Sequence, residues 1–310
     1  MHTMKTLHTV ADTVLKRIRE SSPYYKHYNN NVQWGINRKY VKYGNECRRE
    51  YAKNHDTNFP PNPLIEAPAT MVKGAISSDS AKAMSNKISQ LIEKKDKCIY
   101  REPECKDMQA VILQPIDNLG DGVLDVLRNP EVNDVLLSIF RGYYTIATAI
   151  GFRSYPNNHQ KSSWLWHSDC YPARTCKIFL HLTKADEETG VTDFMSVEDT
   201  EAYRKAGYYG LGGERLVGED VEAFAKKHGL PYRPFHINAE PGDASIFDMN
   251  YLHRAVAPKK EYRDVVQLLF QPSPISWEED LERNGECLRH CARGFAKDPS
   301  DRSVEAVSMM

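Results

Sequence analysis

The segment that most restricts how this chain can fold is 164–169, which reads Trp-Leu-Trp-His-Ser-Asp. In an extended strand alternate side chains share a face, so His167 and Asp169 would point the same way. On a helix, residues two apart diverge. The tryptophans favour a strand, and Pro172 ends regular pairing soon afterwards. The segment therefore predicts a strand that offers two metal ligands from one face.

A third ligand lies far downstream, at His253 in the run Asp-Met-Asn-Tyr-Leu-His. Two histidines and one carboxylate form the facial triad of non-haem Fe(II) sites, which leaves coordination positions open. Arg263 follows after 263 − 253 = 10 residues, and a guanidinium can hold a carboxylate through two parallel hydrogen bonds. Each of these residues alone is more often structural. Their combination favours a metal site with a small-molecule carboxylate bound by Arg263 beside it.

The order of these motifs resembles that of the Fe(II)/2-oxoglutarate-dependent oxygenases, and the surrounding sequence is similar to their phytanoyl-CoA dioxygenase-like branch. The similarity covers roughly residues 140–275. It is carried by the tryptophan-rich segment that ends in His167-x-Asp169, by Lys-Ile-Phe-Leu-His-Leu-Thr at 177–183, and by Pro-Gly-Asp-Ala-Ser-Ile-Phe-Asp at 241–248. Where relatives usually read Gly-Pro, this chain has Gly190-Val191, so the loop there and its substrate contacts differ.

The resemblance implies that His167, Asp169 and His253 bind Fe(II), that Arg263 binds the distal carboxylate of 2-oxoglutarate, and that O2 is the second cosubstrate. It implies oxidation of an unactivated C–H bond with release of succinate and CO2. Because Asp169 is present, halogenation is not expected, whereas hydroxylation, desaturation and oxidative cyclisation stay open. Arg254 is the alternative to Arg263 for binding this carboxylate. If a strand continues through His253, however, the side chain of Arg254 points away from the site.

Lys177 shares a strand face with Phe179, which makes it a candidate contact for a carboxylate of cosubstrate or substrate. Alternatively, Lys177 lies at the mouth of the barrel and only extends its charged end to solvent; this interpretation is equally open. The expected substrate is a small metabolite, carboxylate-bearing or amino-acid-derived, as in secondary metabolism and biosynthesis. The cations that favour it are Arg153, Lys161, Arg174 and Lys177. The alternatives are an acyl-CoA hydroxylase of the same family, a zinc-dependent hydrolase, and a non-catalytic jelly-roll that binds a small ligand.

Composition limits the other functions. The chain has 310 residues and a formal net charge of −1, which offers no basic surface for nucleic acid. Its 7 cysteines are scattered, as in reduced intracellular proteins. No apolar run is long enough to cross a bilayer. These features predict a cytoplasmic protein with neither a nucleic-acid nor a membrane partner, and they leave the oligomeric state open.

Short strands with tight turns and no βαβ rhythm favour a jelly-roll over a parallel sheet. We expect a mainly β fold with flanking helices, in which N-terminal helices support a double-stranded β-helix. The chain is interpreted as one domain, 1–310, with these parts: helical and irregular support at 1–142, a jelly-roll core at about 143–275, and a polar tail at 276–310. A polar, glycine-rich insertion at about 196–236 is predicted to cover the barrel mouth.

Several elements can be placed from local signals. A helix is expected to begin near Asn129-Pro130 and to run up to Gly142, because proline suits the first turn of a helix. Another, inside the insertion, should end at Gly229. The predicted core strands lie at 144–150, 176–182, 243–248 and 265–270.

Overall fold

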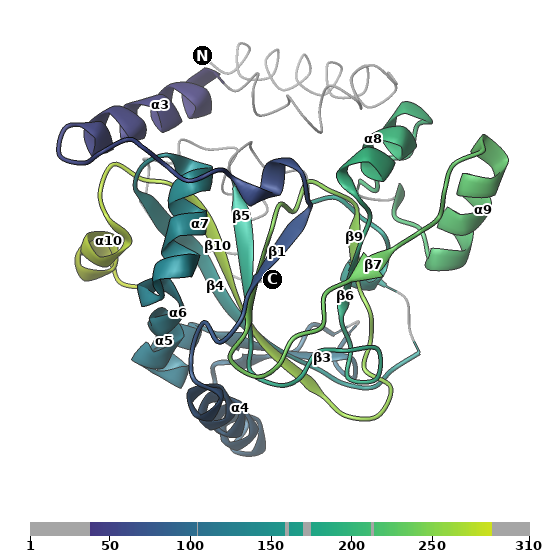
Figure 1. Cartoon of the computed structure of the whole chain (residues 1–310). Coiled ribbons are helices and arrows are strands. Elements are labelled where there is room, and N and C mark those ends of the chain that lie inside the picture. The colour runs from purple at the N-terminus through teal and green to yellow at the C-terminus, as the bar shows by residue number, and fades with distance from the viewer. Residues whose placement is uncertain (1–37, 104, 159–160, 170–174, 212–213, 287–310) are drawn as a thin grey trace, which may run out of the picture.

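The computed structural model describes residues 38–103, 105–158, 161–169, 175–211 and 214–286. Two antiparallel sheets form its core (Figure 1). The large sheet has the order β1 (Ala69–Val72), β8 (Ala244–Phe247), β5 (Cys176–His181), β10 (Arg263–Pro272), β4 (Tyr144–Ser154), β3 (Gln109–Leu113) and β2 (Ile99–Tyr100). The small sheet has the order β7 (Phe235–His236), β6 (Thr192–Phe194) and β9 (His253–Ala255).

The chain alternates between these sheets. It runs from β5 in the large sheet to β6 and β7 in the small one, returns through β8, crosses again to β9, and ends in β10. Each neighbouring pair of strands is antiparallel, as in β10 with β4 and in β6 with β9. This winding is a double-stranded β-helix, and the predicted fold class is confirmed.

Helices cover the outer face of the large sheet and the far side of the small one (Figure 1). In chain order the helices and helical turns are α3 (Arg38–Ala52), η1 (Pro63–Ile65), α4 (Ser78–Glu93), α5 (Pro115–Leu119), η2 (Asp121–Leu124), α6 (Asp125–Arg128), α7 (Pro130–Phe140), η3 (Ser162–Trp164), α8 (Val197–Lys205), α9 (Gly218–His228) and α10 (Trp277–Asn284). None of the described helices is both long and apolar enough to span a membrane.

Strand alternation divides the large sheet into two faces. On β5, Ile178 and Leu180 are buried in the main core together with side chains of α4 and α7. Their neighbours Lys177 and Phe179 therefore point to the opposite face, toward the small sheet, where both line a cavity. On β5 this alternation places Ile178 and Leu180 under the helices and Lys177 and Phe179 inside the barrel.

The N-terminal and C-terminal parts differ in detail from the prediction. The sequence predicts only helical and irregular support for residues 1–142, but β1, β2 and β3 lie there and extend the large sheet at both edges. The polar tail that the sequence predicts from residue 276 begins with helix α10, whose Trp277 is buried in the main core. Most of the remaining tail lies outside the described residues.

Candidate metal centre

The two histidines of the predicted triad are direct neighbours on adjacent segments. His167 and His253 each donate a backbone N–H to the other's carbonyl, at 2.9 Å in both directions. This pairing places their side chains on one face, with ring centroids 4.3 Å apart. The backbone of Asp169 is held by a hydrogen bond to the Met249 carbonyl, at 2.9 Å. The segment that carries His167 is joined by isolated bridges rather than by the regular strand that the sequence predicts.

His167, Asp169 and His253 bring one ligand atom each within 4.8 Å of the others. The Asp169 carboxylate lies 3.5 Å from Nε2 of His167 and 3.6 Å from Nε2 of His253. Each imidazole donates from Nδ1 to a backbone carbonyl, that of Leu165 at 2.7 Å and that of Tyr251 at 2.8 Å. This contact fixes the tautomer and leaves both Nε2 lone pairs for a metal, so the donor set fits a divalent cation.

Burial sets the charge of these ligands. It lowers the pKa of His167 to about 3, with a further contribution from His253, and it also lowers the pKa of His253. Both rings are therefore neutral, as metal ligands must be. Burial alone would raise the pKa of Asp169, but the charge and hydrogen bond of Lys177 together with the two histidines outweigh burial, and the pKa falls below its usual range. The site thus offers two neutral nitrogens and one carboxylate.

Lys177 reaches this site from β5. Its Nζ lies 2.5 Å from Oδ2 of Asp169, and both side chains are largely buried, at 13% and 14% exposed. The sequence predicts a contact between Lys177 and a carboxylate of the cosubstrate or substrate. In the structure the carboxylate that it contacts belongs to the metal site itself.

A cavity of about 100 Å³ lies between the two sheets beside the triad. Its large-sheet wall includes Gln267 and Arg263, and Arg263 is only 6% exposed. Among the described residues, no group accepts a hydrogen bond from Nε or Nη1 of Arg263. Burial lowers the pKa of Arg263 to about 10, so the group is still a cation at neutral pH. An unpaired buried cation is unfavourable, and this one faces a cavity that can hold an anion.

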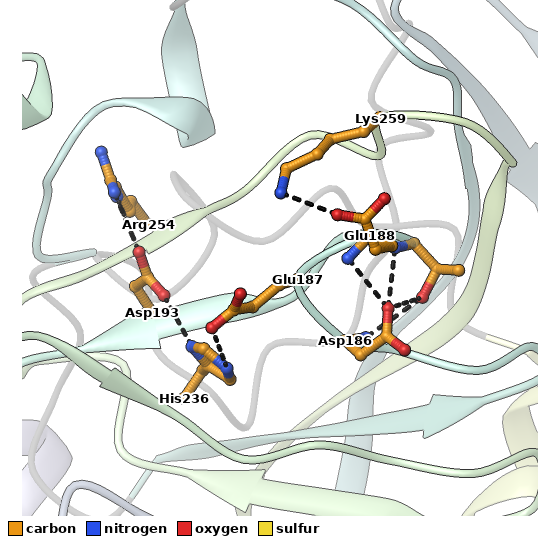
Figure 2. A network of polar contacts seen from close by, with 8 residues as sticks. Asp186, Glu187, Glu188, Asp193, His236, Arg254 and Lys259 are labelled. Carbon is orange, nitrogen blue, oxygen red and sulfur yellow. Dashed lines mark hydrogen bonds and ion pairs between the residues drawn. The ribbon is translucent and has the colours of Figure 1, made fainter.

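Arg254 points in the other direction. Its Nε and Nη2 both donate to Oδ2 of Asp193 at 3.0 Å, on the outer face of the small sheet (Figure 2). Asp193 also contacts His236, which in turn faces Glu187 (Figure 2). The guanidinium of Arg254 additionally lies 5.2 Å from the ring centroid of Trp166. Arg254 is therefore engaged in a structural network and does not line the triad's cavity.

The other cations that the sequence singles out contribute less to the site. Arg153 is buried under the helices, where its Nε donates to Oδ1 of Asp264 at 2.7 Å. The Ser85 hydroxyl donates to the same carboxylate at 2.6 Å. Arg153 thus belongs to the core, contrary to its predicted role toward a substrate. Lys161 does not line the cavity, and Arg174 lies outside the described residues.

Thr192 is one of several cavity residues that the sequence analysis does not single out; the others include Gln109, Phe152, Ser154, Ser163 and Ala255. Thr192 lies on β6 opposite Ala255, and both line the cavity. The Thr192 hydroxyl is buried and has no hydrogen-bond partner among the described residues. A strand as short as β6 has no readable periodicity, so the inward direction of Thr192 could not be predicted.

The insertion packs on the outer face of the metal-binding segment. Tyr203, Tyr208 and Leu216 form an apolar cluster with Trp166, the residue before His167. The Trp166 N–H donates to the Leu216 carbonyl at 2.9 Å, and the Ser168 N–H donates to the Gly210 carbonyl at 3.2 Å. The insertion therefore supports the metal ligands from behind, and its predicted role as a cover stays a prediction.

We expect Gly210→Ala to weaken both the fold and metal binding. Gly210 has φ +64, and a Cβ there would lie 2.8 Å from the Cα of His167. The strain should cost on the order of 1–3 kcal/mol and displace the metal-binding segment. Gly207→Ala is the matched control, because Gly207 has φ +99 but open space around it. Thermal unfolding and Co(II) titration of both variants check this; equal metal affinities would contradict it.

Comparisons with known proteins give only distant similarity. The chain matches no family model, and no curated protein matches it. Its structure is similar to the non-heme alpha ketoglutarate dependent carbocyclase SnoK from nogalamycin biosynthesis, with TM-score 0.48 and 14% identity over 78% of this chain and 96% of that chain. It is also similar to apo EctD from S. alaskensis, with TM-score 0.47 and 14% identity over 66% of this chain and 73% of that one. A third similar structure is the epimerase SnoN, also from nogalamycin biosynthesis, with TM-score 0.46 and 11% identity over 74% of this chain and 83% of that chain.

Proposed function

We propose that this chain is an Fe(II)- and 2-oxoglutarate-dependent dioxygenase that oxidises an unactivated C–H bond in a small molecule. The observation that carries the proposal is a triad of His167, Asp169 and His253 beside a cavity into which the buried Arg263 faces, without an ion-pair partner among the described residues. A triad alone would suit several metals and reactions. Arg263 adds a position for the second carboxylate of a keto acid whose other end chelates the metal.

The protein's own residues would position the reactants and exclude water. His167 and His253 present Nε2 because backbone carbonyls hold their Nδ1 atoms. Arg263 would orient the cosubstrate in the cavity between the two sheets. When bound, Fe(II) and 2-oxoglutarate would supply the oxidising power, with succinate and CO2 as coproducts.

We further propose that the substrate is a small polar metabolite, carboxylate-bearing or amino-acid-derived. The cavity beside the triad is small, and its wall carries the polar side chains of Gln109, Ser154 and Gln267. A long acyl chain would need a larger cavity than this one of about 100 Å³, which favours the small metabolite over an acyl-CoA ester. Whether the product is hydroxylated, desaturated or cyclised depends on the substrate.

The test is formation of succinate by the purified protein with Fe(II), 2-oxoglutarate and O2. With a metabolite extract added, mass spectrometry should show a product that has gained one oxygen or lost two hydrogens. A zinc hydrolase would instead act without O2, and a non-catalytic protein would bind metal without forming succinate. Either of these results contradicts the proposal.

A further inference from the structure

Arg215, in the insertion, lies next to the metal ligand His167. Leu216 and Trp166 form an antiparallel bridge, so the next pair in the same register joins Arg215 to His167. Leu216 and Trp166 both belong to the apolar cluster on the outer face. Because strand neighbours alternate, Arg215 and His167 share the inner face.

This register completes a row of side chains across the small sheet. Phe194 pairs with His253, His253 with His167, and His167 is followed by Arg215. Directly opposed residues have their Cβ atoms about 4.5–5.5 Å apart. In agreement, the charge of Arg215 adds to burial in lowering the pKa of both His167 and His253. Arg215 is thus a cation at the edge of the metal centre.

Arg215 also lacks a partner that would explain it structurally. Within the part of the chain that the structure describes, its buried Nε has no hydrogen-bond partner and no carboxylate pairs with its guanidinium. Other arginines nearby are engaged: Arg204 donates to the Asn250 carbonyl, Arg233 binds Asp199, and Arg254 binds Asp193. An arginine held without a counter-ion beside a metal site is suited to bind an anion.

The cosubstrate does not account for this cation. Arg263 faces the cavity beside the triad, whereas Arg215 does not line that cavity. Among the described residues, the ionised side chains that act on the triad or line its cavity are Asp169, Lys177, Arg215 and Arg263, with a sum of −1 + 1 + 1 + 1 = +2. Fe(II) and the dianion of 2-oxoglutarate together add no net charge. The site with Fe(II) and 2-oxoglutarate bound therefore stays positive. A further anion would lower the free-energy cost of holding these cations together away from water.

We propose that Arg215 binds a carboxylate of the primary substrate, so that the enzyme selects acids over their neutral amides. This inference rests on the proposed function and adds a specificity residue to it. The insertion then has a chemical role, since it carries the recognition group to the edge of the metal centre, next to His167.

The test uses full-length protein loaded with Co(II) and 2-oxoglutarate under anaerobic conditions, so that no turnover occurs. The probes are acetate, N-acetylglycine and N-acetylphenylalanine, each compared with its primary amide, and the readout is the visible spectrum of Co(II). We expect the wild type to bind at least one acid about 10-fold or more tightly than its amide, as a charge-assisted contact should give. Arg215→Gln should lose this preference while its affinities for Co(II) and 2-oxoglutarate stay within about twofold.

Arg233→Gln is the matched control, because Arg233 lies in the same insertion but pairs with Asp199 at its surface. It should keep the preference for acids. The inference is overturned if the wild type prefers no acid, if Arg215→Gln keeps the preference, or if Arg215→Gln loses 2-oxoglutarate affinity instead. A wild type that binds neither Co(II) nor 2-oxoglutarate would overturn the proposed function itself, which separates the two failures.

Discussion

His253→Ala is expected to abolish succinate formation and to lower Fe(II) affinity by about 100-fold or more. Loss of a residue that merely supports a metal ligand typically costs about 10- to 100-fold in affinity, so loss of a ligand should cost at least the upper value. The substitution removes the imidazole, but the backbone hydrogen bonds between residues 253 and 167 can persist, because they involve no side chain. Anaerobic Fe(II) titration and a succinate assay measure the two effects.

The control for this experiment is His228→Ala. His228 is exposed at the end of α9, its ring lies tilted against that of Phe224, and it is not part of the triad. It should bind Fe(II) like the wild type. Undiminished iron binding by His253→Ala would remove the proposed centre from consideration, whatever the activity of the variant.

Much of the β-helix could be predicted because its strands carry local signals. The predicted strand at 144–150 lies within β4, and the one at 265–270 lies within β10. Helix α7 runs from Pro130 to Phe140, and the Asn129 side chain accepts hydrogen bonds from Glu131 N–H and Val132 N–H as a cap should. The convergence of His167, Asp169 and His253 followed from residue type and strand alternation, and the structure brings these residues together. Their role as iron ligands stays a prediction.

What the sequence could not reveal depends on pairing between distant segments. Strands β1, β2 and β3 have two to five residues each, too few for a periodic pattern, and β1 and β3 join the large sheet by pairing with β8 and β4. Arg215 is 48 residues from His167 (215 − 167 = 48), and only the bridge between Leu216 and Trp166 makes them neighbours. Arg153 had the right charge for a substrate contact, yet its partner Asp264 is known only from the packing.

Arg263→Met is expected to raise the 2-oxoglutarate requirement about 10- to 100-fold without lowering the melting temperature. A charge-assisted contact contributes about 1.5–3 kcal/mol, and its loss should appear as weaker cosubstrate binding. Stability should be kept because Arg263 is buried without a counter-ion among the described residues, so an apolar side chain of similar length removes an unfavourable charge. Arg263→Lys should restore binding only in part, since lysine cannot form two parallel hydrogen bonds.

Arg254→Met should give the opposite result, which makes the two arginines controls for each other. Arg254 forms an ion pair with Asp193, so its loss leaves a largely buried carboxylate without that partner and should lower the melting temperature. Its affinity for 2-oxoglutarate should not change, because Arg254 does not line the cavity. Calorimetric titration of the Co(II)-loaded variants with 2-oxoglutarate, together with thermal unfolding, shows which of the two arginines binds the cosubstrate. If Arg254→Met loses the cosubstrate and Arg263→Met keeps it, the roles of the two arginines are reversed.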